Sequence, residues 1–152
     1  MPELYLEDFE IGQVFASGRL RVEQDDILRF ATEFDPQAFH LDPEVARTTF
    51  FGGLAASGWH TAALTMRLLV ESNFAPAGGI VGAGFDELIW PRPVRPGDEL
   101  RVKSEILDAR PSKSRPGQGM IKVRGITLNQ NDQPVQRFVG NLVVRERPKG
   151  SN

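Results

Sequence analysis

Hydrophobic residues recur with two different periods along the chain, and the period changes near residue 79. Apolar positions follow helical spacing in Gln24–Glu33 and again in Ser57–Phe74. From Gly79 onward, four segments alternate between hydrophobic and polar residues, and an earlier segment, Gln13–Val22, also reads as a strand. The order of strand, helices and then four strands predicts an α+β domain.

The segment Ser57–Phe74 carries apolar residues on nearly every face, which is typical of a buried helix. The later strands are separated by the turn-rich stretches "RPGD", "RPSKSRPGQG" and "NQNDQ", so we expect antiparallel pairing. These features predict one antiparallel sheet curled around one long helix. At 152 residues the chain fits a single domain, expected over residues 1–147, with residues 148–152 as a tail.

The stretch "FDPQAFHLD" places Asp35 and His40 in an irregular link between two helices, the second of which begins with Asp42 as N-cap and Pro43 at its first position. One interpretation is structural: Asp35 ends a helix in a turn, and His40 is a loop residue. The other is chemical, because a bent loop can point a carboxylate and an imidazole into one cleft. Such a pair suits proton transfer or the activation of water.

The entry to the long helix carries Gly52, Gly53 and Gly58, with Ser57 as a predicted N-cap. These residues serve either a tight chain entry or a binding site for a carbonyl oxygen at the unpaired N–H groups of the helix. One turn into the helix, His60 is predicted to be packed and hydrogen-bonded rather than catalytic.

Composition excludes several classes of function. The absence of cysteine rules out disulfides, thiolate catalysis and cysteine-based zinc sites, and one histidine with one aspartate is too small a set for a metal. A net charge of -2, with no long basic block, argues against nucleic acid. The N-terminus does not resemble a signal peptide and no apolar run is long enough for a membrane span, so we expect no membrane partner and a cytoplasmic location.

Two further motifs have weak functional interpretations. "GGIVGAG" partly matches a dinucleotide-binding fingerprint, but a strand follows it instead of a helix. "WPRPVRPGDEL" is interpreted as an edge strand that leads into a turn. Scattered basic residues could meet ligand phosphates or could be solvated surface residues, and these are Arg92, Arg95, Lys113 and Arg115.

Taken together, "DFEIGQVF", "FDPQAFHLD", "GGLAASGWHTAAL" and "WPRPVRPGDEL" resemble the MaoC-like dehydratases, the family of (R)-specific enoyl-CoA hydratases. The resemblance covers nearly the whole chain and implies a hotdog fold, an antiparallel sheet wrapped around a long central helix. Two positions depart from the family pattern. The proline follows Asp35 directly instead of standing just before His40, and Ser57 replaces a histidine found in many members.

The resemblance implies reversible hydration of a trans-2-enoyl-CoA, without a metal or redox cofactor because coenzyme A belongs to the substrate. It implies that Asp35 and His40 activate the water and that the Gly58 N–H binds the thioester oxygen. A hotdog thioesterase and a non-catalytic acyl-CoA-binding module remain alternatives. A homodimer or a dimer of dimers is expected. Residues expected to contact the substrate are Ser57, Phe39 and Trp59.

Overall fold

A computed structural model of the chain describes residues 3–150, and its main element is an antiparallel sheet of six strands. Their order is β1-β4-β5-β6-β3, and β2 pairs separately with β4. The strand bounds are Val14–Ala16 (β1), Leu20–Arg21 (β2), Val81–Ile89 (β3), Glu99–Pro111 (β4), Gln118–Leu128 (β5) and Pro134–Arg145 (β6).

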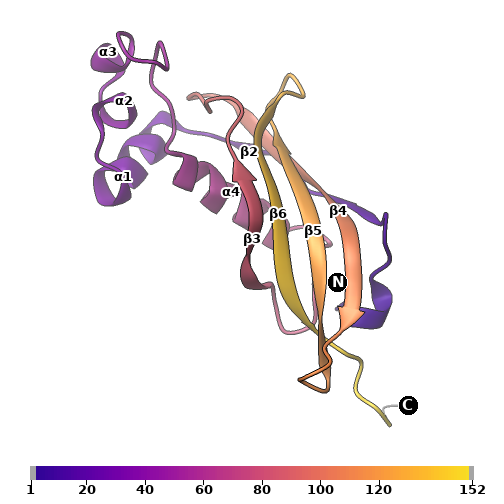
Figure 1. Cartoon of the computed structure of the whole chain (residues 1–152). Coiled ribbons are helices and arrows are strands. Elements are labelled where there is room, and N and C mark those ends of the chain that lie inside the picture. Colours follow the sequence, from indigo (N-terminus) through magenta and orange to yellow (C-terminus); the bar gives the residue numbers. More distant parts are fainter. Residues whose placement is uncertain (1–2, 151–152) are drawn as a thin grey trace.

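One helix, α4, runs along the sheet, while three shorter helices gather beyond its N-terminal end (Figure 1). We call these three helices the overhang. This arrangement confirms the predicted α+β fold with an antiparallel sheet around a central helix. The helix bounds are Gln24–Phe34 (α1), Ala38–Leu41 (α2), Pro43–Ala46 (α3) and Gly58–Val70 (α4), with a 3-10 turn at Leu6–Asp8 (η1).

The predicted strand Gln13–Val22 is two short strands, β1 and β2, with a break at Ser17. The Ser17 hydroxyl accepts the Val102 N–H at 2.8 Å, and the Ser17 N–H donates to the Val102 carbonyl at 3.0 Å. The Ser17 hydroxyl therefore occupies the Val102 N–H, which the backbone of a continuing strand would otherwise pair with. The pairing with β4 resumes only at Leu20.

The central helix is shorter and less buried than predicted. It ends at Val70, because the Ser72 hydroxyl accepts the Phe74 N–H at 3.1 Å and turns the chain away. One face packs Leu68 and Leu69 into the hydrophobic core against the sheet. The expectation of burial on all sides is wrong, since the exposed large hydrophobic side chains include three from this helix, Trp59, Met66 and Val70.

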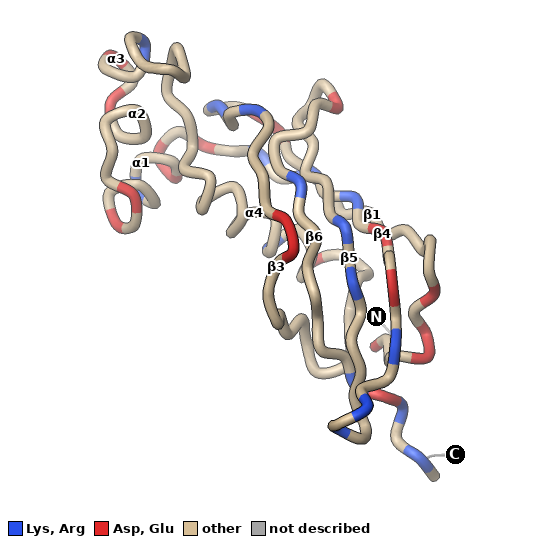
Figure 2. Tube along the Cα trace, in the orientation of Figure 1, with Lys and Arg blue, Asp and Glu red and all other residues tan. Residues whose placement is uncertain are grey.

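Positions of Lys and Arg and of Asp and Glu are both distributed along the strands rather than gathered in one basic block (Figure 2). Lys122 contacts Asp86 and Arg137 contacts Glu87, each at 2.7 Å, across strands of the sheet. These pairs are exposed enough that each contributes little to stability. Among the described residues, no helix is long and apolar enough to cross a membrane.

Candidate active site

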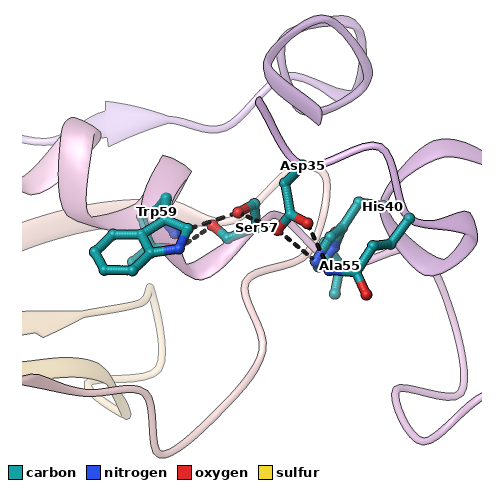
Figure 3. Close-up of polar contacts among 7 residues, drawn as sticks. Asp35, His40, Ala55, Ser57 and Trp59 are labelled. Atoms are coloured by element: carbon teal, nitrogen blue, oxygen red, sulfur yellow. Dashed lines mark hydrogen bonds and ion pairs between the residues drawn. The ribbon is translucent and has the colours of Figure 1, made fainter. Parts of the chain in front are cut away.

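The overhang brings Asp35 and His40 into contact. Helix α1 ends at Phe34, and Asp35 follows it as the C-cap. The link predicted to be irregular contains one helical turn, α2, and this turn presents His40. The His40 Nε2 lies 3.3 Å from the Asp35 Oδ2, with 6% of the His40 side chain and 17% of the Asp35 side chain exposed (Figure 3).

Hydrogen bonding determines which His40 nitrogen carries the proton. The Nδ1 lies 2.6 Å from the Ala55 carbonyl oxygen, which can only accept, so Nδ1 is the donor. The neutral ring therefore presents a free lone pair at Nε2, on the side of Asp35. The ring centroids of Phe39 and Phe51 lie 4.6 and 5.9 Å from the imidazole centroid, and both rings pack on the imidazole. The ring is thus fixed in one tautomer and one orientation.

The Asp35 carboxylate is held by two side-chain donors. The Ser57 hydroxyl donates to Oδ2 at 2.7 Å, and the Gln37 amide donates to Oδ1 at 2.5 Å. Burial by itself raises the pKa of this carboxyl, but the hydrogen bonds from Gln37 and Ser57 and the nearby His40 together lower the pKa below its ordinary value. Asp35 is consequently ionised at neutral pH.

Ser57 also caps helix α4, as predicted. Its hydroxyl accepts the Trp59 N–H at 3.3 Å while it donates to Asp35, and the side chain is buried. The next residue, Gly58, begins the helix, and its N–H has no hydrogen-bond acceptor within the part of the chain that the structure describes. The positive end of the helix dipole therefore lies beside the Asp35–His40 pair.

Gly58 is required by space rather than by an unusual backbone angle. A Cβ atom at this position would lie 2.7 Å from two atoms of the Trp90 indole, and the φ angle of Gly58 is not positive. The glycine thus lets the Trp90 ring lie directly against the start of α4. The sequence contains no local sign of this contact, because the two residues are far apart in the chain.

A cleft of about 300 Å³ opens beside this helix start. Its lining includes His40, Gly58, Thr61, Trp90 and Arg92. Trp90 was expected only as part of an edge strand, but it lies beyond the end of β3 and forms a wall of the cleft. Arg92 is thus the one basic candidate that borders the cleft.

The other expected contact residues lie around this lining. Asp35 contacts His40, and Ser57 directly precedes Gly58; His40 and Gly58 both line the cleft. Phe39 packs edge-to-face on His40. Trp59 lies edge-to-face against Trp90, with ring centroids 5.3 Å apart, and lines a separate apolar pocket of about 130 Å³ between α4, β3 and β6.

Two residues have different surroundings from those expected. Arg95, a candidate for ligand phosphates, donates to the carbonyls of Leu54 (3.2 Å) and Phe51 and so holds the loop before α4. His60 is packed, as predicted, and stacks on Phe30 with ring centroids 4.7 Å apart. The prediction that it is hydrogen-bonded is wrong at Nδ1, which is buried and has no partner among the described residues.

A sheet wrapped around one helix, with an aspartate and a histidine of the overhang beside the start of that helix, is the hotdog arrangement that the sequence resemblance implied. A sequence model of the MaoC like domain matches residues 8–127. The chain therefore belongs to the MaoC-like dehydratase family, as the resemblance implied.

Three relatives illustrate the range of this family. A MaoC-like dehydratase from Rhodospirillum rubrum is 56% identical in sequence to this chain. Its crystal structure superposes with a TM-score of 0.92, and the match covers 95% of this chain and 99% of that one. The uncharacterized protein YdeM of Bacillus subtilis (strain 168) is 40% identical over 91% of this chain and 96% of its own length. A 3-hydroxybutyryl-CoA dehydratase of Methylorubrum extorquens is 32% identical over 76% of this chain and 73% of its own length.

Proposed function

We propose that this protein is a hydratase that adds water reversibly to trans-2-enoyl-CoA thioesters and forms (R)-3-hydroxyacyl-CoA. One observation carries the proposal: the His40–Asp35 contact of 3.3 Å lies beside the unpaired N–H of Gly58 at the start of α4. Family membership and the name of the Methylorubrum extorquens relative support it. The (R) configuration comes from the family resemblance alone.

The water is activated by His40 and Asp35 acting as a pair. With its Nδ1–H donated to Ala55, His40 presents Nε2 as an acceptor, and the ionised Asp35 carboxylate has spare lone pairs beside it. A water that donates to both groups has its own lone pair free to attack the β-carbon of the enoyl group. The new C–O bond forms at that carbon, and the water's proton passes to the pair.

The second proton transfer completes the addition. Attack at the β-carbon moves the electrons of the double bond toward the thioester oxygen, and a proton from the pair then goes to the α-carbon. Water is thereby divided into a hydroxyl group at the β-carbon and a hydrogen at the α-carbon, with no change of oxidation state. Asp35 and His40 share this proton and act as one acid–base unit.

The Gly58 N–H stabilises the charge that develops on the thioester oxygen. It lies in the first turn of a helix of thirteen residues, where the helix dipole adds to the hydrogen bond. A donor of this kind typically accelerates turnover by about 10²–10³. Arg92, at the rim of the cleft, is proposed to meet the phosphates of coenzyme A. No further cofactor is required by this chemistry.

We also propose that the protein works as a homodimer. Strand β3 lies at the end of the sheet order and, among the described strands, pairs with β6 alone, so its other edge is open for a second copy. Val81 and Phe85 on this strand are exposed, as are Met66 and Val70 on the neighbouring helix α4. Sedimentation should show a dimer, and a fully active monomer at micromolar concentration would contradict this. A cytoplasmic location stays a prediction from the sequence.

An assay with crotonyl-CoA tests the proposed reaction. Hydration removes the enoyl absorbance without releasing free thiol. Release of free thiol would instead identify a thioesterase, and saturable binding without either change would identify an acyl-CoA-binding module. Longer enoyl-CoAs should be included, because the cleft does not by itself define the chain length.

A further inference from the structure

The apolar pocket between α4, β3 and β6 contains one polar side chain with an unused donor. Gln136, on β6, lines this pocket and is only 2% exposed. Its Oε1 accepts the Trp90 indole N–H at 2.9 Å. An indole nitrogen can only donate, so the amide must present its oxygen to Trp90 and its NH₂ group elsewhere. Among residues 3–150, this NH₂ group has no hydrogen-bond acceptor.

The Thr65 hydroxyl, which also lines the pocket, already has its hydrogen-bond partners. The Thr65 hydroxyl donates to the Thr61 carbonyl at 2.9 Å, and the Thr127 hydroxyl lies 2.7 Å from Thr65. Because the Thr65 proton is used by the carbonyl, Thr127 must be the donor to Thr65. The Gln136 NH₂ group is therefore a donor in this apolar pocket that no described residue uses. Such a donor favours a ligand that can accept a hydrogen bond from it.

Two indoles in contact, those of Trp59 and Trp90, join the lining of the pocket to the lining of the cleft. Trp90 borders the cleft and touches Gly58, and its N–H bonds Gln136 in the pocket. Trp59 lines the pocket and packs edge-to-face on Trp90. These contacts connect the Gln136 amide with the cleft in which the thioester oxygen is proposed to lie at Gly58.

We propose that the acyl group of the substrate carries an uncharged oxygen acceptor, such as a keto or ether oxygen, that accepts a hydrogen bond from the Gln136 NH₂ group. This inference rests on the proposed function for the acyl thioester itself. The acceptor is uncharged because none of the described residues that line the pocket is charged. A carboxylate there would lose its hydration without gaining a cation.

The test compares the binding of saturated acyl-CoA thioesters, which cannot be hydrated, by calorimetry. Keto-acyl-CoAs with the carbonyl at successive carbons are each paired with the methyl-branched acyl-CoA of the same shape, and adipoyl-CoA supplies a carboxylate. We expect one keto ligand to bind about tenfold more tightly than its branched match. Adipoyl-CoA should bind more weakly than that keto ligand.

Gln136→Met is the matched variant, because methionine has a similar volume and no donor. It should lose the preference for the keto ligand, measured as the ratio of the keto and branched affinities. In this ratio, any general change in binding that follows from loss of the acceptor for the Trp90 N–H cancels. If this variant does not fold, Gln136→Asn replaces it, since the shorter amide withdraws the donor. A wild type without any keto preference, a preference that survives in the variant, or no binding of either class would overturn the inference.

These outcomes are separable from those of the proposed reaction. Hydration of simple enoyl-CoAs with no keto preference in binding would leave the proposed function standing and overturn the role of Gln136. A clear keto preference in binding without hydration of any enoyl-CoA would support the role of Gln136 and overturn the proposed function.

Discussion

The two histidines of the chain occupy opposite kinds of environment although both are buried. The His40 Nδ1 donates to the Ala55 carbonyl, its Nε2 lies 3.3 Å from the Asp35 carboxylate, and the residue borders the cleft. His60 stacks on Phe30, and its Nδ1 has no partner among the described residues. Burial lowers the pKa of His60; the nearby Asp26 opposes this shift and Arg29 adds to it.

Burial alone therefore does not identify a functional histidine. A useful acid–base group needs a fixed tautomer, a charged or polar partner and access to the substrate, and His40 has all three. His60 has burial and a ring contact, and we assign it a packing role. Substitutions at the two positions should therefore separate turnover from stability.

The largest expected effect is a loss of turnover when His40 or its neighbour Asp35 is replaced. His40→Gln and Asp35→Asn should each lower kcat by about 10²-fold or more, because each removes a positioned acid–base group. Their effects should not add, since the two groups act on one water. The measurement is the initial rate of enoyl-CoA hydration, with His60→Gln as the control that retains near-normal turnover. Near-normal turnover in either single variant would remove that residue from the mechanism.

A second effect should appear where Trp90 lies against Gly58. Gly58→Ala keeps the N–H but forces the indole away, and overpacking of this kind typically costs about 1–3 kcal/mol of folding free energy. Proline at this position would meet the same obstacle, so it cannot serve as a clean test of the N–H.

The matched control is Gly58→Ala in a Trp90→Ala background, where the added methyl group has space. Denaturant unfolding of the four proteins should show a large cost of the methyl group only when Trp90 is present. Equal costs in both backgrounds would show that the indole does not pack on Gly58 as the structure has it.

Ser57→Ala should have a smaller effect, on both the stability of the protein and the pKa of Asp35. Loss of the helix cap should cost about 0.5–2 kcal/mol of stability. Loss of the hydrogen bond to Asp35 removes an interaction that lowers the pKa of this carboxyl, so the pKa should rise. The acidic limb of the pH–rate profile should therefore move to higher pH. Ser57→Thr, which keeps the hydroxyl, is the control, and an unmoved limb in Ser57→Ala would contradict the role of this bond.

The smallest effect is expected at His60. Because its folded-state pKa lies below the ordinary value near 6.5, the unfolded chain binds the proton more readily, and stability is lost as the pH falls below about 6.5. His60→Leu should flatten this dependence while turnover stays near normal. Melting temperatures between neutral and mildly acidic pH would check it. An unchanged slope would mean that His60 is not the group responsible.

Local signals predicted much of the fold and part of the site. The helical spacing of α1 and the caps at Asp42 and Ser57 depend on neighbouring residues, and the structure has them as predicted. The single-domain boundaries stay a prediction. Features missed from the sequence depend on distant contacts: the break at Ser17 requires Val102, and the wall of the cleft requires Trp90 to reach Gly58. No spacing within a segment encodes such contacts.

The most direct test of the central claim is the hydration of crotonyl-CoA in D₂O by the wild-type protein, followed by NMR of the product. We expect (R)-3-hydroxybutyryl-CoA with deuterium at the α-carbon and an intact thioester, and a rate about 10²-fold lower in His40→Gln. Release of free coenzyme A, or an equal rate of hydration in His40→Gln, would rule out hydration by the Asp35–His40 pair.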